Sequence, residues 1–185
     1  MRRMPGILQC RMPTVEALCA LLGLVPHPIE GGFFAETYRS ADLLGGDALP
    51  AHYRGARAAG TAIYYLLTPE TFSAMHRLGS DEIFHFYLGD PVEMLQLAPD
   101  GSHRVVVIGP DLEAGQRPQV VVPRGVWQGA RLRPGGRLAL LGTTVAPGFD
   151  YADYETGARA ALLASHPAAR DLVTALTREP SERGG

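Results

Sequence analysis

Short apolar runs alternate with turn-forming residues along most of this chain, from Gly32 to Val145. Breaks such as Leu78-Gly79-Ser80 and Gly89-Asp90-Pro91 recur at short spacing. Several short strands at this spacing are typical of an antiparallel sandwich or barrel. The strands that we predict are Phe33–Arg39, Thr61–Leu67, Thr71–His76, Glu82–Leu88, Val92–Leu97, Arg104–Ile108, Gln119–Val122, Val126–Leu132 and Arg137–Val145.

Helical patterns flank this region. Thr14 and Gly23 are suited to cap a short helix over 14–22. Two short helices are expected after Pro147-Gly148, and the Gly- and Ala-rich segment 45–60 is expected to be a loop. The predicted organisation is an N-terminal extension (1–31), one β-domain (32–150), and C-terminal helices ending in a frayed tail (151–185).

The composition excludes several functions. All 17 basic residues are Arg, so a Schiff-base lysine and a phosphate-loop lysine are both ruled out. A net charge of -2 gives no general reason to expect nucleic acid or an acidic membrane as a partner. No apolar run approaches the roughly 20 residues that span a membrane. We interpret Cys10 and Cys19 as reduced thiols and predict a cytoplasmic protein.

The most informative motif runs from His76 to Gly89. His76 ends one predicted strand, a turn follows, Glu82 begins the next strand, and Gly89 lies seven residues after Glu82. A hairpin across this turn would bring His76 and Glu82 close together. A second motif, Pro123-x-Gly125 followed by Gln128, joins two later strands.

This pair of motifs resembles the cupin superfamily. Its first motif has two histidines, a glutamate and then a glycine, and its second is Pro-x-Gly-x-x-His. The resemblance implies an all-β double-stranded β-helix, the cupin jelly-roll barrel, with one short helix before it and two after. However, Ala74 and Gln128 stand where two of the three metal-binding histidines would be. A neutral amide is a poor substitute for an imidazole. We therefore expect no cofactor, with a divalent metal at His76 and Glu82 as the alternative.

The likeness extends to one largely uncharacterised cupin family. It rests on the run from Pro28 to Ser40, on Phe-His-Phe-Tyr at 84–87 and on Ala-Pro-Gly-Phe-Asp at 146–150. That family's members are usually homodimers, so a homodimer is expected. The run at 32–36 is also loosely similar to dTDP-sugar epimerases, which are metal-free cupins that use a His base and a Tyr acid.

Four residues are candidates for acid–base chemistry: His76, Glu82, His85 and Tyr38. The alternative for His76 and Glu82 is an ordinary hairpin hydrogen bond. His85 is three residues from Glu82 and would face away on a flat strand, so it is equally well explained as a core or interface residue.

A second group of residues could contact a ligand. Strand alternation places Tyr38 on the same face as Glu36 and places Arg39 on the opposite face, where it contacts an anion or forms a surface ion pair. Gln128 is expected to face the pocket. Phe84 and Phe86 would either line the pocket or pack in the core. The other histidines, including His27, are given no role.

Three functions are consistent with these residues. The first is a pocket that binds a small polar metabolite and acts as a metal-independent isomerase or epimerase. The second is a metal-dependent oxygenase or isomerase with a rescued third ligand. The third is a non-catalytic binding protein. No nucleic-acid or membrane partner is expected.

Overall fold

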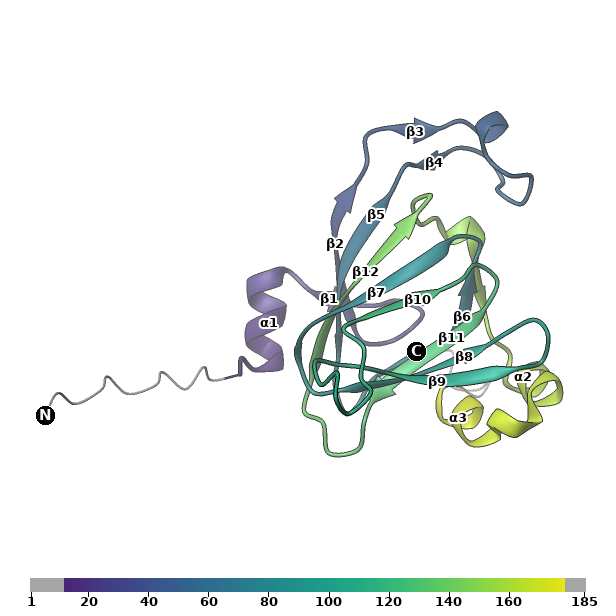
Figure 1. The fold of residues 1–185 in the computed structure, drawn as a ribbon. Helices are drawn as coiled ribbons and strands as arrows, with labels where there is room; N and C mark the ends of the chain where they lie inside the picture. The colour runs from purple at the N-terminus through teal and green to yellow at the C-terminus, as the bar shows by residue number, and fades with distance from the viewer. Residues whose placement is uncertain (1–11, 179–185) are drawn as a thin grey trace, which may run out of the picture.

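The computed structural model describes residues 12–178. Two antiparallel sheets pack face to face as a jelly-roll sandwich, with helices on the outer sides (Figure 1). The six-stranded sheet has the order β1-β2-β5-β12-β7-β10, and the five-stranded sheet has the order β13-β6-β11-β8-β9. The predicted all-β architecture is confirmed, but the sheets remain open at their edges and do not close into a barrel.

The strands lie close to their predicted positions. The bounds in the six-stranded sheet are β1 Val25–Pro26, β2 Phe33–Arg39, β5 Thr61–Leu67, β12 Ala139–Ala146, β7 Asp81–Gly89 and β10 Gln119–Val122. Those in the five-stranded sheet are β13 Tyr154–Thr156, β6 Phe72–Leu78, β11 Trp127–Leu132, β8 Val92–Leu97 and β9 His103–Ile108. Two of these strands, β1 and β13, were not predicted from the sequence because they are only two and three residues long.

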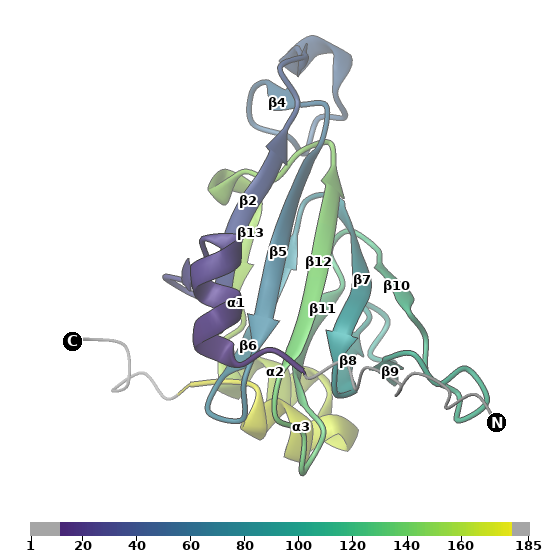
Figure 2. The same ribbon diagram turned by 90° about the vertical axis from the view of Figure 1, so that its left-hand side faces the viewer.

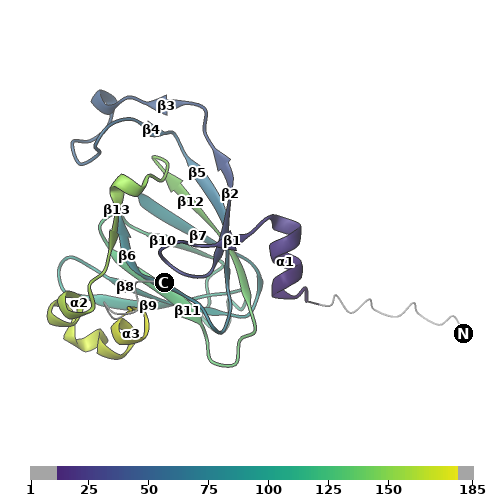
Figure 3. The same cartoon turned by 180° about the vertical axis from the view of Figure 1, so that it is seen from behind.

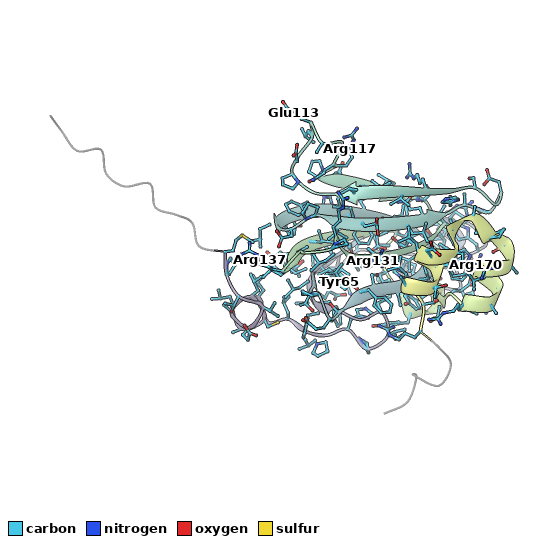
Figure 4. All side chains as sticks on the ribbon, turned by 90° about the horizontal axis from the view of Figure 1, so that it is seen from below. Tyr65, Glu113, Arg117, Arg131, Arg137 and Arg170 are labelled. Atoms are coloured by element: carbon cyan, nitrogen blue, oxygen red, sulfur yellow. The ribbon has the colours of Figure 1, made fainter. Side chains whose placement is uncertain are left out.

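Three apolar clusters hold the layers together. The largest fills the space between the sheets, where Tyr65, Phe84 and Met94 are almost completely buried. Figure 4 shows Tyr65 near the middle of the molecule, whereas Glu113 and Arg117 lie on a peripheral loop. Burying apolar surface on both faces of each sheet is the main source of stability.

The helices cover the outer faces of the sheets. Helix α1 (Val15–Leu22) packs Leu18 against the six-stranded sheet, with Thr14 and Gly23 as its caps (Figure 2). Helices α2 (Arg159–Ser165) and α3 (Arg170–Ala175) cover the five-stranded sheet and are separated by the 3₁₀ turn η3 (Pro167–Ala169) (Figure 3). The helices match the sequence prediction. Cys10 and the tail from Glu179 lie outside the described residues.

The segment 45–60, expected to be a loop, belongs largely to a small arm. Strands β3 (Leu43–Leu44) and β4 (Arg57–Ala58) pair, with the 3₁₀ turn η1 (Gly46–Ala48) between them. The arm rises beyond the ends of β2 and β5 (Figure 1). Arg57 anchors it through two hydrogen bonds of 2.7 Å to the buried carboxylate of Asp153, in the segment that follows β12.

The Arg57–Asp153 ion pair gives the first prediction. Arg57→Gln should lower the free energy of unfolding by about 3–5 kcal/mol, because it leaves the Asp153 carboxylate buried without a cation. Chemical denaturation measures the loss, and hydrogen exchange should show reduced protection over the arm. The matched control is Arg137→Gln, whose pair with Asp90 is exposed and should contribute less than about 1 kcal/mol. Equal losses in the two variants would contradict this assignment.

Candidate functional site

The two sheets bring three polar side chains together in their shared interior. His76 comes from β6, Glu82 from β7 and Gln128 from β11, and all three are buried. Register pairs Gln128 with His76 across β11 and β6. The predicted hairpin across the turn after β6 is wrong, because this turn carries the chain to the opposite sheet and β6 does not pair with β7. Inward-facing residues on facing sheets therefore meet: His76 Nε2 lies 3.9 Å from Glu82 Oε2, and Gln128 Nε2 donates to Glu82 Oε2 at 2.6 Å.

The motif glycine Gly89 has a geometric role at the far end of β7. Its φ of 108° is in the left-handed region that favours glycine. A Cβ there would lie 2.9 Å from the Cα of Ala139 and would also overlap the Leu138 carbonyl. The glycine therefore allows β7 to end tightly against β12.

Glu30 completes the buried centre, and the sequence analysis assigned it no role. Its Oε1 lies 3.8 Å from His76 Nε2, and its Oε2 accepts a hydrogen bond from Ser73 at 3.2 Å. Glu30 lies in the loop between β1 and β2, which has no periodic pattern that would reveal an inward side chain. The only signal was the run Pro28-Ile29-Glu30-Gly31-Gly32, in which both glycines have positive φ.

His27 is the second residue that was missed. Its Nδ1 accepts hydrogen bonds from the backbone N–H groups of Ile29 and Glu30, so its neutral form carries the proton on Nε2. That Nε2 lies 3.7 Å from Glu30 Oε1. Burial lowers the pKa of His27 more than the neighbouring Glu30 raises it.

The pKa of His76 is shifted in the opposite direction, upward. Burial alone would lower its pKa, but the carboxylates of Glu30 and Glu82 outweigh that effect and raise the pKa to about 9. Its Nδ1 is 2.8 Å from the Ala74 carbonyl, to which it donates, and its ring stacks on Tyr154 with centroids 5.1 Å apart. His76 is therefore a buried imidazolium at neutral pH.

A pocket of about 280 Å³ opens next to this centre. Glu30 and His27 line it, whereas His76, Glu82 and Gln128 lie in the layer behind Glu30. We also expect from the sequence that Gln128 lines one cavity with His76 and Glu82, but none of the three lines this pocket. Its lining combines charged, aromatic and small polar residues: His27, Glu30, Phe34, Glu36, Arg39, Thr61, Ala62, Ile63, Thr143, Val145, Phe149, Asp150 and Tyr151.

A β-bulge corrects the prediction for β2. Between Glu36 and Tyr38 the register with β5 shifts by one residue, which reverses the alternation. Arg39 consequently lies on the same side as Glu36, lines the pocket with it and donates to its carboxylate at 2.6 and 3.0 Å. Tyr38 does not line the pocket and is 56% exposed.

Three further candidates from β7 also lie outside this pocket. Because β7 pairs with β10 without a bulge from Glu82 to His85, His85 faces the opposite way and contacts Thr144 and Gln119. Phe84 belongs to the core between the sheets, and Phe86 packs against it. Core packing, the second interpretation of both rings, is what the structure shows.

Comparison with known proteins now decides the family. A family model described as "Cupin superfamily (DUF985)" matches residues 16–157. The chain belongs to this cupin family. An uncharacterised protein of Saccharomyces cerevisiae is 31% identical over 141 residues, which cover 71% of this chain and 69% of the yeast protein. The weaker similarity to dTDP-sugar epimerases stays a prediction.

Solved structures agree with this family assignment. A hypothetical protein from Leishmania major is 32% identical with a TM-score of 0.80, covering 90% of this cupin and 100% of that chain. A protein from Shewanella oneidensis is 34% identical with a TM-score of 0.78, covering 90% and 99%. A cupin 2 domain-containing protein from Halorhodospira halophila is 13% identical with a TM-score of 0.50, covering 80% and 84%, and shares the fold alone.

Two positions of the cupin metal set lack a suitable donor in this chain. Ala74 supplies no donor, and Gln128 directs its amide nitrogen at Glu82. Within residues 12–178, no three His, Cys, Asp or Glu side chains form a group that could hold a metal ion. The donors therefore do not fit the four-ligand site.

No helix in the described part of the chain is long and apolar enough to cross a membrane.

The buried imidazolium predicts a pH-dependent stability. Folding raises the pKa of His76 from about 6.5 to about 9, so it stabilises the protonated form. This contribution is complete below about pH 6.5, falls as the pH rises and is lost above about pH 9. Urea unfolding of the wild type should show a loss on the order of 3 kcal/mol across that range.

The variant His76→Gln should lack this dependence, since it has no group that titrates there. The control His103→Gln removes an exposed histidine and should keep the wild-type slope. If His76→Gln and the wild type lost stability in parallel, His76 would not be protonated in the folded protein.

Proposed function

We propose that this cupin binds a small polar metabolite in the pocket beside Glu30 and moves a proton on it, as a metal-independent isomerase or epimerase. The observation that carries the proposal is the position of Glu30. Its carboxylate lines the pocket and also lies within 3.8 Å of the ring nitrogens of both His27 and His76. A carboxylate held between an open pocket and a buried imidazolium is suited to general base catalysis.

The energetic cost of this centre supports a functional role. Burying charges costs several kcal/mol per ion, and an apolar core would be at least as stable. Two buried polar atoms beside His76, Gln128 Oε1 and Tyr154 Oη, also lack a hydrogen-bond partner within the described residues. Perturbed and incompletely satisfied groups of this kind cluster at functional sites.

The chemistry follows from these positions. Glu30 would take a proton from a carbon next to a carbonyl group, breaking the C–H bond and placing the electron pair on the carbonyl oxygen. The neutral His27 would donate a hydrogen bond from Nε2–H to that oxygen. Return of the proton from Glu30 to the neighbouring carbon, together with transfer of the hydroxyl proton to the former carbonyl oxygen, completes an isomerisation with no net oxidation. Return to the opposite face of the same carbon, after the intermediate has turned in the pocket, completes an epimerisation. His76 lies 3.8 Å from the Glu30 carboxylate, and Tyr154 holds His76 by stacking.

Deuterium incorporation tests the reaction. Metabolites that raise the melting temperature would be incubated with the protein in D₂O, and exchange at carbon followed by NMR. Glu30→Gln should keep binding within a few-fold and slow exchange by about 10²–10⁴-fold, because the amide cannot accept the proton. Glu70→Gln, at an exposed turn, is the matched control and should exchange at the wild-type rate. Binding without exchange in the wild type would instead support the non-catalytic alternative.

Elemental analysis tests the metal-dependent alternative. Protein purified without added metal should contain far less than one equivalent of any transition metal, because zinc and related ions need at least three good ligands. His76→Ala should then not change the metal content, and should weaken ligand binding. A stoichiometric metal that disappears in His76→Ala would promote the oxygenase or metal-isomerase alternative.

We also propose a homodimer formed through the edge of the six-stranded sheet. Strand β1 pairs only with Phe33 and Phe34, so the rest of β2 has a free edge within the described residues. Tyr38 lies in this unpaired part of β2 and is 56% exposed, and Val25 in the neighbouring strand β1 is 54% exposed. Unpaired strand edges favour association. Light scattering at micromolar concentration should give twice the chain mass, and Tyr38→Glu should shift it toward the monomer; a monomeric wild type would refute the proposal.

A further inference from the structure

The charges around the pocket are unevenly distributed. Three carboxylates line it, those of Glu30, Glu36 and Asp150. The one arginine in the lining is Arg39, which is paired with Glu36 and also donates to the Phe149 carbonyl at 3.3 Å. Asp150 makes no ion pair within 4.0 Å among residues 12–178, and its carboxylate instead caps the 3₁₀ turn that begins at Tyr151.

The charged residues behind the pocket lining do not reverse the negative charge of the lining. The positive charge of His76 is shared by Glu30 and Glu82. Arg178 donates to the backbone carbonyls of Ile29 and Glu30 from outside the pocket. With the Arg57–Asp153 pair included, five carboxylates face four cations around the pocket. Asp150 has no ion-pair partner within 4.0 Å among residues 12–178, although Arg39 and Arg57 attract it from farther away.

The apolar part of the lining is largely aromatic. Phe34, Phe149 and Tyr151 belong to it, and the rings of Phe149 and Tyr151 meet edge to face at 5.0 Å. Aromatic faces beside carboxylates attract cations through the ring quadrupole and through direct charge attraction. Phosphate recognition by side chains instead commonly uses free arginine or lysine donors. This chain contains no lysine, and the pocket's arginine is already paired.

We propose that the pocket selects a small polar metabolite that carries a protonated amine, with Asp150 as the residue that recognises the charge. The same arrangement disfavours phosphorylated and nucleotide-linked compounds. This inference rests on the proposed function, because it assigns a ligand class to the same pocket.

A pair of charged nitroxide probes tests the inference without knowledge of the ligand. A PROXYL radical carrying an aminomethyl group and one carrying a carboxylate relax nearby protons according to the local potential. For protons of Ile63, Val145 and Phe149, the cationic probe should give about threefold stronger relaxation than the anionic probe at low salt, as expected for about one unscreened charge. A stronger effect of the anionic probe would overturn the inference.

Two variants assign the effect to Asp150. Asp150→Asn keeps the capping hydrogen bond, since Asn caps as well as Asp, and should reduce the ratio about twofold. Asp111→Asn, on the exposed loop before β10, is the matched control and should leave the ratio unchanged. An unchanged ratio in Asp150→Asn would exclude Asp150 as the recognition residue and overturn the inference.

The metabolite screen separates this inference from the proposed function. Amine-bearing compounds should dominate the hits, and their affinity should fall several-fold in Asp150→Asn. Hits that are mainly phosphorylated or carboxylated would refute the inference while leaving the proposed function intact. If no compound of any charge binds in the pocket, the proposed function itself fails, even where the nitroxide ratio is as expected.

Discussion

A protonated imidazole held between two carboxylates connects the main parts of this molecule. His76 belongs to the five-stranded sheet, Glu82 to the six-stranded sheet and Glu30 to the loop that leads into β2. Because an unpaired buried charge is costly, these three elements must keep their relative positions for the charges to remain compensated. The pocket is built on this arrangement, since Glu30 is both a wall of the pocket and a partner of the buried ring.

The chain also shows how a cupin frame is preserved when its metal ligands are replaced. Gln128 occupies a ligand position, yet it remains buried and polar and donates to Glu82. Ala74 contributes its carbonyl, which orients His76 through Nδ1. The polar interior therefore persists as a hydrogen-bonded charge network, and Tyr154, from a strand absent from the predicted set, stacks on its central ring.

The segment after β12 contributes both to the pocket and to the attachment of the β3–β4 arm. Phe149, Asp150 and Tyr151 line the pocket, while Asp153 anchors the β3–β4 arm through Arg57. A short stretch of chain thus carries both part of the pocket lining and the attachment of a flanking arm. Several such residues on one short segment are typical of a loop that a rigid scaffold holds at both ends, because the scaffold fixes where the loop's side chains lie.

The sequence by itself predicted the longer strands and the flanking helices, because alternation, turn residues and caps are local signals. The expected approach of His76, Glu82 and Gln128 rested on the cupin resemblance. Only the tertiary structure decided the rest. Glu30 and His27 lie on a loop without periodicity, so their inward positions follow from packing against β6. A single bulge moved Arg39 to the pocket and Tyr38 to solvent, because one extra residue in a strand exchanges its two faces.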